Sequence, residues 1–292
     1  MSSATLTREL VIKGSRSLPS FPVVITEILA ALDDPDGNFD FLVHAISRDP
    51  IISARVLSVA NTVAMRGTRD AEVCDIAMAT ALIGINRVRH ITLISSLSTF
   101  VAGASRSGMP SSFWQHSVAV GVCCEELARH IIAPVAPATA LVAGLLHDIG
   151  QLWLYHFNAQ AAQACWREAT AKAISVDELE RKYFGADHSL IGAWLAESWH
   201  LPTDIVAAIG GHHQPDAALG VTLVPLVPLV HVAEVLSNAL DLAGRAENRV
   251  THLSSAACEQ LGLVWNDDIR ALFGRIEARS IHANAFFGAT TP

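Results

Sequence analysis

Histidines and acidic residues recur along this chain in a pattern that could bind metal ions. The chain has 13 histidines, and His147 is followed directly by Asp148 at the end of the apolar stretch 138–146. An adjacent His-Asp pair at a helix end can offer one imidazole nitrogen and one carboxylate to the same ion. Because His-Asp dipeptides are common, the pair predicts a metal site only if other ligands accompany it.

Other candidate ligands share helix faces with apolar residues. His116, for example, follows Phe113 by three residues and precedes Val120 by four, which places all three on the buried face of a helix. Leaving one buried polar group unpaired costs about 1–3 kcal/mol, so these side chains must meet one another, water or a metal. The candidate metal ligands are His116, His147, Asp148, His188, His212, His213 and Glu234.

The mixture of imidazole and carboxylate groups limits which ion could bind. It suits a divalent first-row metal, namely iron, manganese, zinc or nickel. The alternative is a hydrogen-bonded network in the core that holds no ion, which is the commoner arrangement for a single histidine. For the whole set both interpretations stay open. If the site is active, Asp148 is the candidate catalytic residue, and no residues are predicted to bind a further cofactor.

Composition indicates what positions these residues. Hydrophobic residues make up 51% and charged residues 16% of the 292 residues, with a mean hydropathy of +0.36, which excludes an intrinsically disordered chain. Three stretches without Asp, Glu, Lys or Arg, at 90–105, 131–147 and 217–233, are shorter than the roughly 20 apolar residues that span a bilayer. They also contain serines or prolines, so we expect buried core helices and no membrane span.

Apolar residues recur at helical spacing, and helix-length segments follow one another between short turns. The segment 76–83, for instance, is expected to be a helix that ends at Gly84. This pattern predicts an all-α fold. Residues rich in Gly, Ser and Pro at 103–112, and a weaker break near 244–248, divide the chain into predicted domains 1–105, 106–244 and 245–292.

Charge and cysteine content limit the partners and the compartment. The formal net charge is −8 and the basic residues are scattered, which argues against a nucleic-acid-binding surface. Arg8, Glu9 and Lys13 stand where a signal peptide would have an apolar run, so a cytoplasmic location is expected. The 5 cysteines show no C-x-x-C spacing and are predicted to be reduced, mostly buried thiols.

The order of the candidate ligands resembles that of the HD superfamily of metal-dependent phosphohydrolases. More specifically, the chain resembles HDOD domain proteins, which carry the HD-related output domain of bacterial signalling, over roughly residues 15–240. The resemblance rests on LPSFP at 18–22, AISRDP at 45–50, ARVLSVAN at 54–61, ATALIGINRVRHITL at 79–93, FWQHS at 113–117, GLLHDIGQLWL at 144–154, DHSLIGAWLAESWHLP at 187–202 and GGHHQP at 210–215.

The resemblance implies an all-helical protein in which an N-terminal helical bundle packs on an HD-like helical bundle. It also implies a regulatory or scaffold module of bacterial signal transduction, usually without demonstrated catalysis. Its partners would be signalling proteins of no stated identity, rather than nucleic acid or a membrane, and a homo-oligomer is left open.

The resemblance also implies how metal ions would be divided among the ligands. The related HD-GYP phosphodiesterases hydrolyse cyclic di-GMP at a two- or three-metal site. By correspondence, one metal would be held by His116, His147, Asp148 and Glu234. Asp148 would bridge to a second metal, held by His188, His212 and His213.

Three departures from the active relatives bear on catalysis. Gln151 stands where they carry a lysine that would place positive charge beside the scissile phosphate, Glu234 replaces an aspartate, and residues 214–217 replace their GYP segment. The missing lysine and the missing GYP segment favour a non-catalytic module, whereas Glu234 could still bind a metal. The complete ligand set favours the alternative, a metal-dependent phosphohydrolase in which a metal ion activates water for attack on a phosphate ester. A third alternative is a sensor that binds a metal or nucleotide without hydrolysing it.

Overall fold

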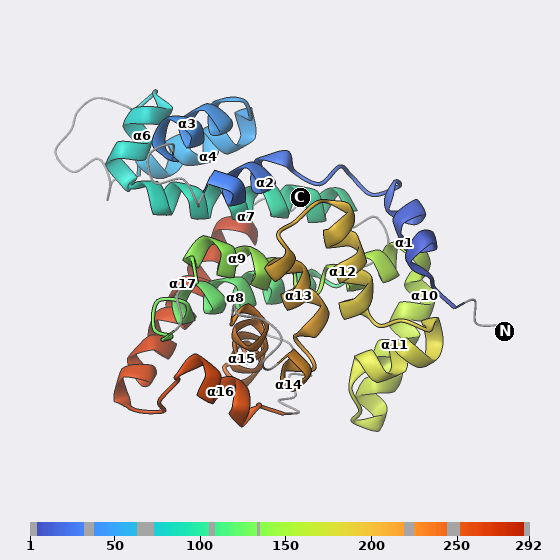
Figure 1. The fold of residues 1–292 in the computed structure, drawn as a ribbon. Coiled ribbons are helices and arrows are strands. Elements are labelled where there is room, and N and C mark those ends of the chain that lie inside the picture. Colours follow the sequence, from blue (N-terminus) through green and yellow to red (C-terminus); the bar gives the residue numbers. More distant parts are fainter. Residues whose placement is uncertain are drawn as a thin grey trace. The chain divides into compact units, whose positions relative to one another are not determined.

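The structure is a computed structural model and describes residues 5–31, 38–62, 73–104, 109–132, 135–218, 225–243 and 252–288. Within these ranges the regular elements are helices and no β-strand is present, which confirms the predicted all-α fold (Figure 1). The chain divides into two compact units. The small unit is Phe21–Phe100, and the large unit combines Met1–Ser20 with Val101–Pro292.

The small unit is built from short helices whose ends are set by local side chains and turns. Its helices are α2 (Val23–Ala30), α3 (Asn38–Ser47), α4 (Pro50–Ala60), α6 (Ile76–Ile83) and the first part of α7 (Ile85–Ala104). Asp49 caps α4, because its Oδ1 accepts hydrogen bonds from the amides of Ile51 and Ile52 at 2.9 and 3.1 Å. Gly84, with a φ of 87°, ends α6 where the sequence predicts it.

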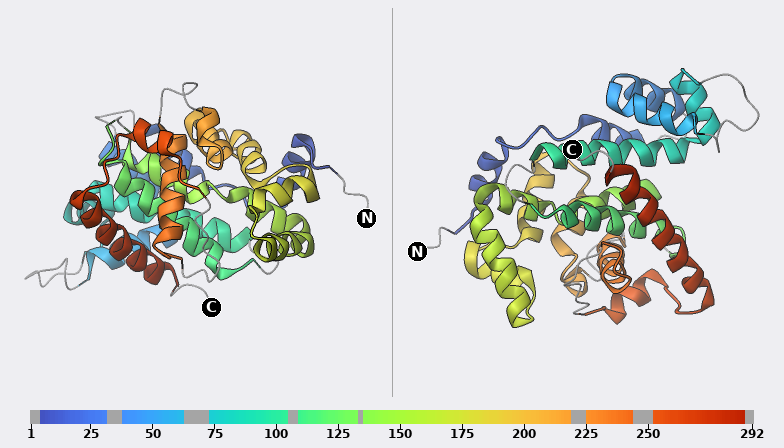
Figure 2. Two further views of the ribbon diagram at one scale, coloured as in Figure 1. Left: turned by 90° about the horizontal axis from the view of Figure 1, so that it is seen from below. Right: turned by 180° about the vertical axis from the view of Figure 1, so that it is seen from behind.

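The large unit carries all the candidate ligands. Its helices are α1 (Arg8–Ser15), α8 (Ser111–Leu127), α9 (Pro137–Leu146), α10 (Ile149–Lys172), α11 (Val176–Phe184), α12 (His188–Ser198), α13 (Thr203–Gly211), α14 (Pro215–Ala218), α15 (Leu226–Ala239), α16 (Ser255–Leu261) and α17 (Asp267–Gly288). α8 packs against α9, α15 and α17, and α12 packs against α10 and α13 (Figures 1 and 2). The helices that carry the candidate ligands therefore contact one another.

Two of the charge-free stretches form the centre of the large unit. Every residue from Ala140 to Leu146 in α9 is buried, and so is every residue from Leu226 to Ala233 in α15. α8 and α9 approach so closely that a Cβ added to Gly144 would lie 2.7 Å from the Cα of Gly121. The high hydrophobic content therefore serves the core, and no described helix is long and apolar enough to cross a bilayer.

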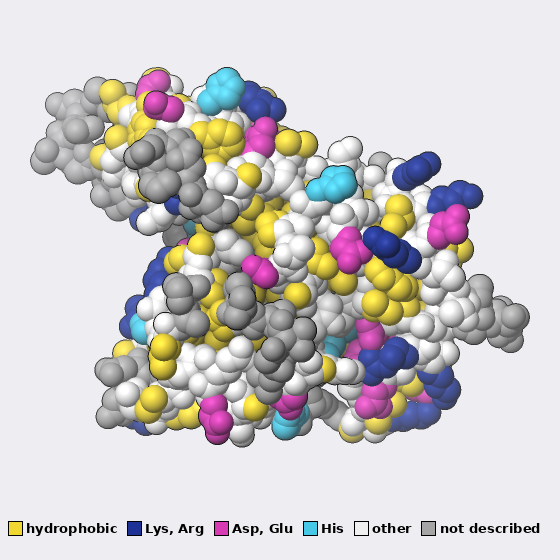
Figure 3. Space-filling model, viewed as in Figure 1, with side chains coloured by type: hydrophobic (Ala, Val, Ile, Leu, Met, Phe, Trp, Pro, Cys, Tyr) yellow, Lys and Arg dark blue, Asp and Glu magenta, His cyan; other side chains and the backbone are white. Residues whose placement is uncertain are grey.

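The predicted domain boundaries fall beside residues that the structure does not describe. Residues 105–108 and 244–250 lie outside the described ranges, so the three-domain division stays a prediction. The cysteines follow the expectation, because Cys123, Cys124, Cys165 and Cys258 are buried and Cys74 is exposed. On the face drawn in Figure 3, basic and acidic side chains are interspersed.

The N-terminal segment, residues 5–20, is held against the helices of the large unit. The amide of Leu6 donates a hydrogen bond to the carbonyl of Phe184 at 2.7 Å. Arg8 pairs with Glu197 of α12 at 2.8 Å, although the two are 189 residues apart in the sequence. The backbone of α1 also lies against the indole ring of Trp153 in α10. The segment thus belongs structurally with helices that follow it much later in the chain.

The last helix, α17, is fastened to α8 by ion pairs. Glu125 and Glu126 of α8 are both 5% exposed. Arg279 of α17 pairs with both carboxylates. Arg129 also pairs with both, at 2.9 and 2.8 Å. Arg275 of α17 also lies 3.6 Å from Glu126, so the two buried acids pair with three arginines, two of which come from α17.

Removing the Arg279 guanidinium is expected to destabilise this contact. Arg279→Ala should lower the free energy of unfolding by about 2 kcal/mol, because two buried carboxylates lose a charged donor. Urea unfolding followed by circular dichroism measures the change. Arg167→Ala, at an exposed position of α10, is the matched control and should change stability by less than about 0.5 kcal/mol. Equal effects of the two substitutions would show that the ion pairs do not fasten α17.

Candidate metal centre

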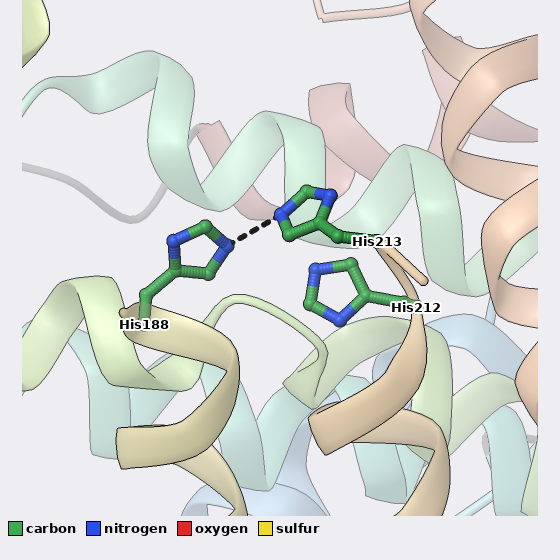
Figure 4. Close-up of side chains that lie close together, drawn as sticks. All are labelled: His188, His212 and His213. Atoms are coloured by element: carbon green, nitrogen blue, oxygen red, sulfur yellow. Dashed lines mark hydrogen bonds between the residues drawn. The ribbon is translucent and has the colours of Figure 1, made fainter. Parts of the chain in front are cut away.

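All seven predicted ligands come together in the large unit. Ligand atoms lie within 4.8 Å of one another in three groups: His116, His147 and Asp148; His147, His212 and Glu234; and His188, His212 and His213. Figure 4 shows the third group, whose rings come from the start of α12 and the end of α13. Their proximity makes a shared metal site feasible, and their role as ligands stays a prediction.

Helix ends position most of these side chains. His147 is the residue after α9 and Asp148 is the residue before α10, so the junction between the two helices places the pair side by side. His212 follows α13 in the same way, and His188 is the first residue of α12. The C-terminal ends of α9 and α13 and the N-terminal ends of α10 and α12 therefore meet at the cluster.

Asp148 lies at the centre of the cluster and is 3% exposed. Its Oδ2 is 3.4 Å from Nε2 of His147 and 3.8 Å from Nε2 of His116. Its Oδ1 is 3.2 Å from Nε2 of His188 and 3.9 Å from Nε2 of His212. Burial opposes ionisation, but the charge interaction with His147 and the hydrogen bond with His188 together lower the pKa of Asp148 well below its usual range. Asp148 is therefore an anion that faces both halves of the cluster.

Backbone carbonyls fix which ring nitrogen of two histidines faces Asp148. Nδ1 of His147 lies 2.8 Å from the carbonyl oxygen of Gly144, and Nδ1 of His212 lies 2.8 Å from that of Ile209. Both carbonyls belong to the last turn of a helix, where no amide of the helix pairs with them. A carbonyl can only accept, so Nδ1 of each ring carries a proton and Nε2 is the nitrogen that faces Asp148. Nε2 of His212 is buried and has no hydrogen-bond partner among the described residues.

Glu180 orients His188 by accepting hydrogen bonds from it, and the sequence analysis did not identify this residue. It is 2% exposed on α11, and its Oε2 accepts hydrogen bonds from the amide of His188 at 2.8 Å and from Nδ1 of the same residue at 2.5 Å. This contact turns Nε2 of His188 into the cluster, an arrangement typical of metal-binding histidines. The available signal was spacing, because Glu180 lies four residues after Val176 and four before Phe184 on one side of α11.

His188 and His213 face each other through their Nε2 atoms. These atoms are 2.8 Å apart (Figure 4), so one proton lies between them. Burial lowers the pKa of His188, but the charge of Glu180 and the hydrogen bond with Asp148 outweigh it and raise the pKa well above its usual value. Burial, together with the charge of neighbouring histidines, lowers the pKa values of His212 and His213 well below the usual value. His188 therefore holds the proton, while His212 and His213 are neutral.

The cluster reaches solvent on the side of His213 and Glu234. Their side chains are 25% and 15% exposed, with Nδ1 of the histidine 3.9 Å from Oε2 of the glutamate. The other five candidate side chains are at most 4% exposed. Gln151, in the first turn of α10, is also buried. Buried lone pairs from imidazoles and a carboxylate, with one open side, fit a divalent first-row metal ion.

Comparison with known sequences places the chain among related proteins. Residues 18–215 match the family model of the HDOD domain. An uncharacterised protein of Treponema pallidum (strain Nichols) is 24% identical over 196 residues, which is 67% of this chain and 37% of that protein. The chain thus spans less than two thirds of the length of this relative.

Solved structures share the fold. An HDOD domain protein of unknown function from Geobacter sulfurreducens has a TM-score of 0.73 at 20% identity, covering 96% of this chain and 98% of the other. A candidate signal transduction protein from Marinobacter aquaeolei VT8 has a TM-score of 0.74 at 20% identity, covering 99% and 62%. A candidate phosphohydrolase from Shewanella amazonensis SB2B has a TM-score of 0.67 at 24% identity, covering 95% and 96%. At these identities the likeness shows the fold.

Proposed function

The chain belongs to the HDOD family, and we propose that it is a bacterial signalling module whose HD-like site binds a divalent metal ion without hydrolysing a phosphoester. One observation carries the metal-binding part: the oxygens of buried Asp148 face four imidazole nitrogens at 3.2–3.9 Å. The signalling part rests on family membership. Its partners would be other signalling proteins in the cytoplasm.

Each side of Asp148 offers ligands to such an ion. His116 and His147 would bind on the side of Oδ2, and His188 and His212 on the side of Oδ1. His213 and Glu234 complete the set at the open side of the cluster. A divalent ion held there supplies positive charge and Lewis acidity. The chain contributes orientation, because the carbonyls behind two histidines and Glu180 behind a third hold the rings in place.

Gln151 supports the absence of turnover. It is 4% exposed in the first turn of α10, directly after the His-Asp junction. The resemblance to HD-GYP phosphodiesterases implies a lysine at this position, whose charge would stabilise the phosphate in the transition state. A neutral amide cannot supply that charge. We therefore expect this chain to bind a metal ion without hydrolysing a phosphoester.

Metal content and hydrolysis should be measured on the same preparation. Protein stripped with EDTA is reloaded with Mn²⁺, Fe²⁺, Zn²⁺ or Ni²⁺, passed through gel filtration and analysed by mass spectrometry of the elements. We expect near-stoichiometric retention of at least one of these ions, and no cleavage of bis(p-nitrophenyl) phosphate or cyclic di-GMP above the blank. Retention of none of the four ions would instead support a hydrogen-bonded core network.

A metal-dependent phosphohydrolase is the second candidate function. The complete set of seven ligands favours it, since a site that only braced the core would not need all of them. Suppose the metal-loaded protein cleaves bis(p-nitrophenyl) phosphate or cyclic di-GMP, and EDTA abolishes this cleavage and added metal restores it. That result would support this candidate over a module that binds metal without catalysis.

Metal affinity is expected to rise with pH. The pKa of His188 is raised, so the metal-free protein carries a proton there at neutral pH, and an ion must displace it to reach Nε2. His212 and His213, whose pKa values are lowered, are already neutral and release none. Apparent affinity for Mn²⁺ should therefore strengthen between about pH 6 and pH 8. Calorimetry in buffers of different ionisation enthalpy should show release of about one proton per ion at pH 7.

The Glu180→Gln variant is the control for this pH dependence. It removes the carboxylate that keeps His188 protonated, so proton release at pH 7 should fall. A binding enthalpy that does not depend on the buffer in the unchanged protein would contradict the assignment of the proton to His188.

A further inference from the structure

A buried histidine outside the ligand set, His231, connects the cluster to the C-terminal part of the chain. His231 lies on α15 and is 5% exposed. Its Nδ1 is 2.8 Å from the carbonyl oxygen of His212, and its Nε2 is 3.2 Å from the backbone amide nitrogen of Ser254. A carbonyl can only accept and an amide can only donate, so Nδ1 carries the proton and Nε2 accepts. Both polar atoms of this buried ring are therefore used.

Ser254 holds the same segment a second time. Its Oγ donates to Oδ1 of Asp216 at 2.5 Å and accepts from the amide of Ala257 at 3.0 Å, which caps α16. Asp216 lies in α14, four residues after His212. Ser254 is 2% exposed. Residues 212–216 are thus tied to the start of α16 at both ends, once through His231 and once through Asp216.

The carbonyl that His231 binds belongs to the peptide bond between His212 and His213. That peptide plane sets where both side chains leave the backbone. Nε2 of His212 faces Asp148 at 3.9 Å, and Nε2 of His213 faces Nε2 of His188 at 2.8 Å. A rotation of this one peptide would therefore move two candidate ligands away from their partners.

We propose that His231 and Ser254 are positioning residues of the metal centre, which lock the His212–His213 peptide through the carbonyl of His212. The inference rests on the proposed metal binding. Both residues lie beyond residue 215, where the family match ends. The start of α16 and His231 of α15 therefore contribute to the geometry of the site. Displacing α16 would weaken metal binding even though α16 carries none of the ligands.

Substitutions at His231 separate its two hydrogen bonds. His231→Leu removes both at similar volume, and His231→Asn keeps a donor at the position of Nδ1 but loses the acceptor for Ser254. We expect Mn²⁺ affinity, measured by calorimetry, to fall about 10- to 100-fold in His231→Leu, as for other partners of metal-binding histidines. His231→Asn should recover part of this loss. His44→Leu, at an exposed position of α3 in the small unit, is the matched control and should bind as the unchanged protein does.

Two further measurements distinguish positioning from loss of stability. The visible spectrum of the Co²⁺-loaded protein reports ligand geometry and should change in His231→Leu, while urea unfolding of the metal-free variant reports stability alone. Asp216→Ala removes the second tie at an exposed residue and should also weaken Mn²⁺ binding. Reduced stability with unchanged Mn²⁺ affinity and Co²⁺ spectrum would overturn the inference.

Hydrogen exchange tests the brace independently of any metal. In the metal-free protein, His231→Leu should speed amide exchange in the peptide covering residues 210–218. If the unchanged protein binds no metal, the proposed function fails, and unchanged exchange would remove the brace as well. If the unchanged protein binds metal and His231→Leu binds it equally well, the brace alone is wrong.

Discussion

Asp148→Asn is expected to weaken divalent metal binding by more than about 100-fold, since loss of an outer-shell partner alone weakens it by about 10- to 100-fold. The carboxylate faces the Nε2 atoms of four histidines. An asparagine of the same size keeps one oxygen but removes the charge that both halves of the cluster share. Titration of the stripped protein with Mn²⁺ by calorimetry measures the change.

Asp40→Asn is the matched control for this substitution. Asp40 is an exposed aspartate in the first turn of α3, within the small unit, and its replacement should leave Mn²⁺ affinity unchanged. Near-ultraviolet circular dichroism of both metal-free variants checks that packing is retained. Affinity within a few-fold of the unchanged protein in Asp148→Asn would show that the ion does not bind at this carboxylate.

Gly150→Ala is expected to disrupt both stability and the metal centre. A Cβ at position 150 would lie 1.9 Å from the carbonyl oxygen of His188 and 2.8 Å from the amide nitrogen of Gly192. Both atoms are backbone of α12, so relief requires the whole helix to move away from α10. We expect a loss of about 3 kcal/mol in the free energy of unfolding, the upper end for overpacking. Mn²⁺ affinity should fall as well, because α12 carries His188 away from Asp148.

Gly274→Ala supplies the control for added bulk on a helical glycine. A Cβ at position 274 of α17 meets nothing within 4 Å. Alanine is the better helix former, so this substitution should leave stability unchanged or raise it by up to about 1 kcal/mol. Thermal unfolding and calorimetry of both variants check the pair. A Gly150→Ala protein as stable as Gly274→Ala would mean that α10 and α12 are not in close contact.

Helical periodicity was sufficient to predict where several candidate ligands lie. His116 shares a face with Phe113 and Val120, and all three are buried as the spacing predicts. His147 and Asp148 are neighbours in sequence and meet at a helix junction, as expected for a pair that ends an apolar stretch. Such predictions succeed because they depend on one helix or one turn at a time.

The residues that brace the ligands could not be predicted in the same way. The spacing of Glu180 from Val176 and Phe184 indicates a buried side of α11, but only the fold brings its carboxylate against His188. His231 presents an apolar neighbourhood in the sequence, and its partners are 19 and 23 residues away. Contacts of this kind depend on how separate helices pack, which spacing within one helix does not report.

The placement of the N-terminal segment has a consequence for synthesis of the chain. Residues 5–20 are synthesised before the small unit, but Glu197, the partner of Arg8, is synthesised 189 residues after it, whereas the small unit needs only the residues from Phe21 to Phe100. We therefore expect the small unit to fold first during translation, with the segment before it still undocked. The small unit is in effect an insertion in the sequence of the large unit, and the segment before it docks only after much of the chain that follows has been synthesised.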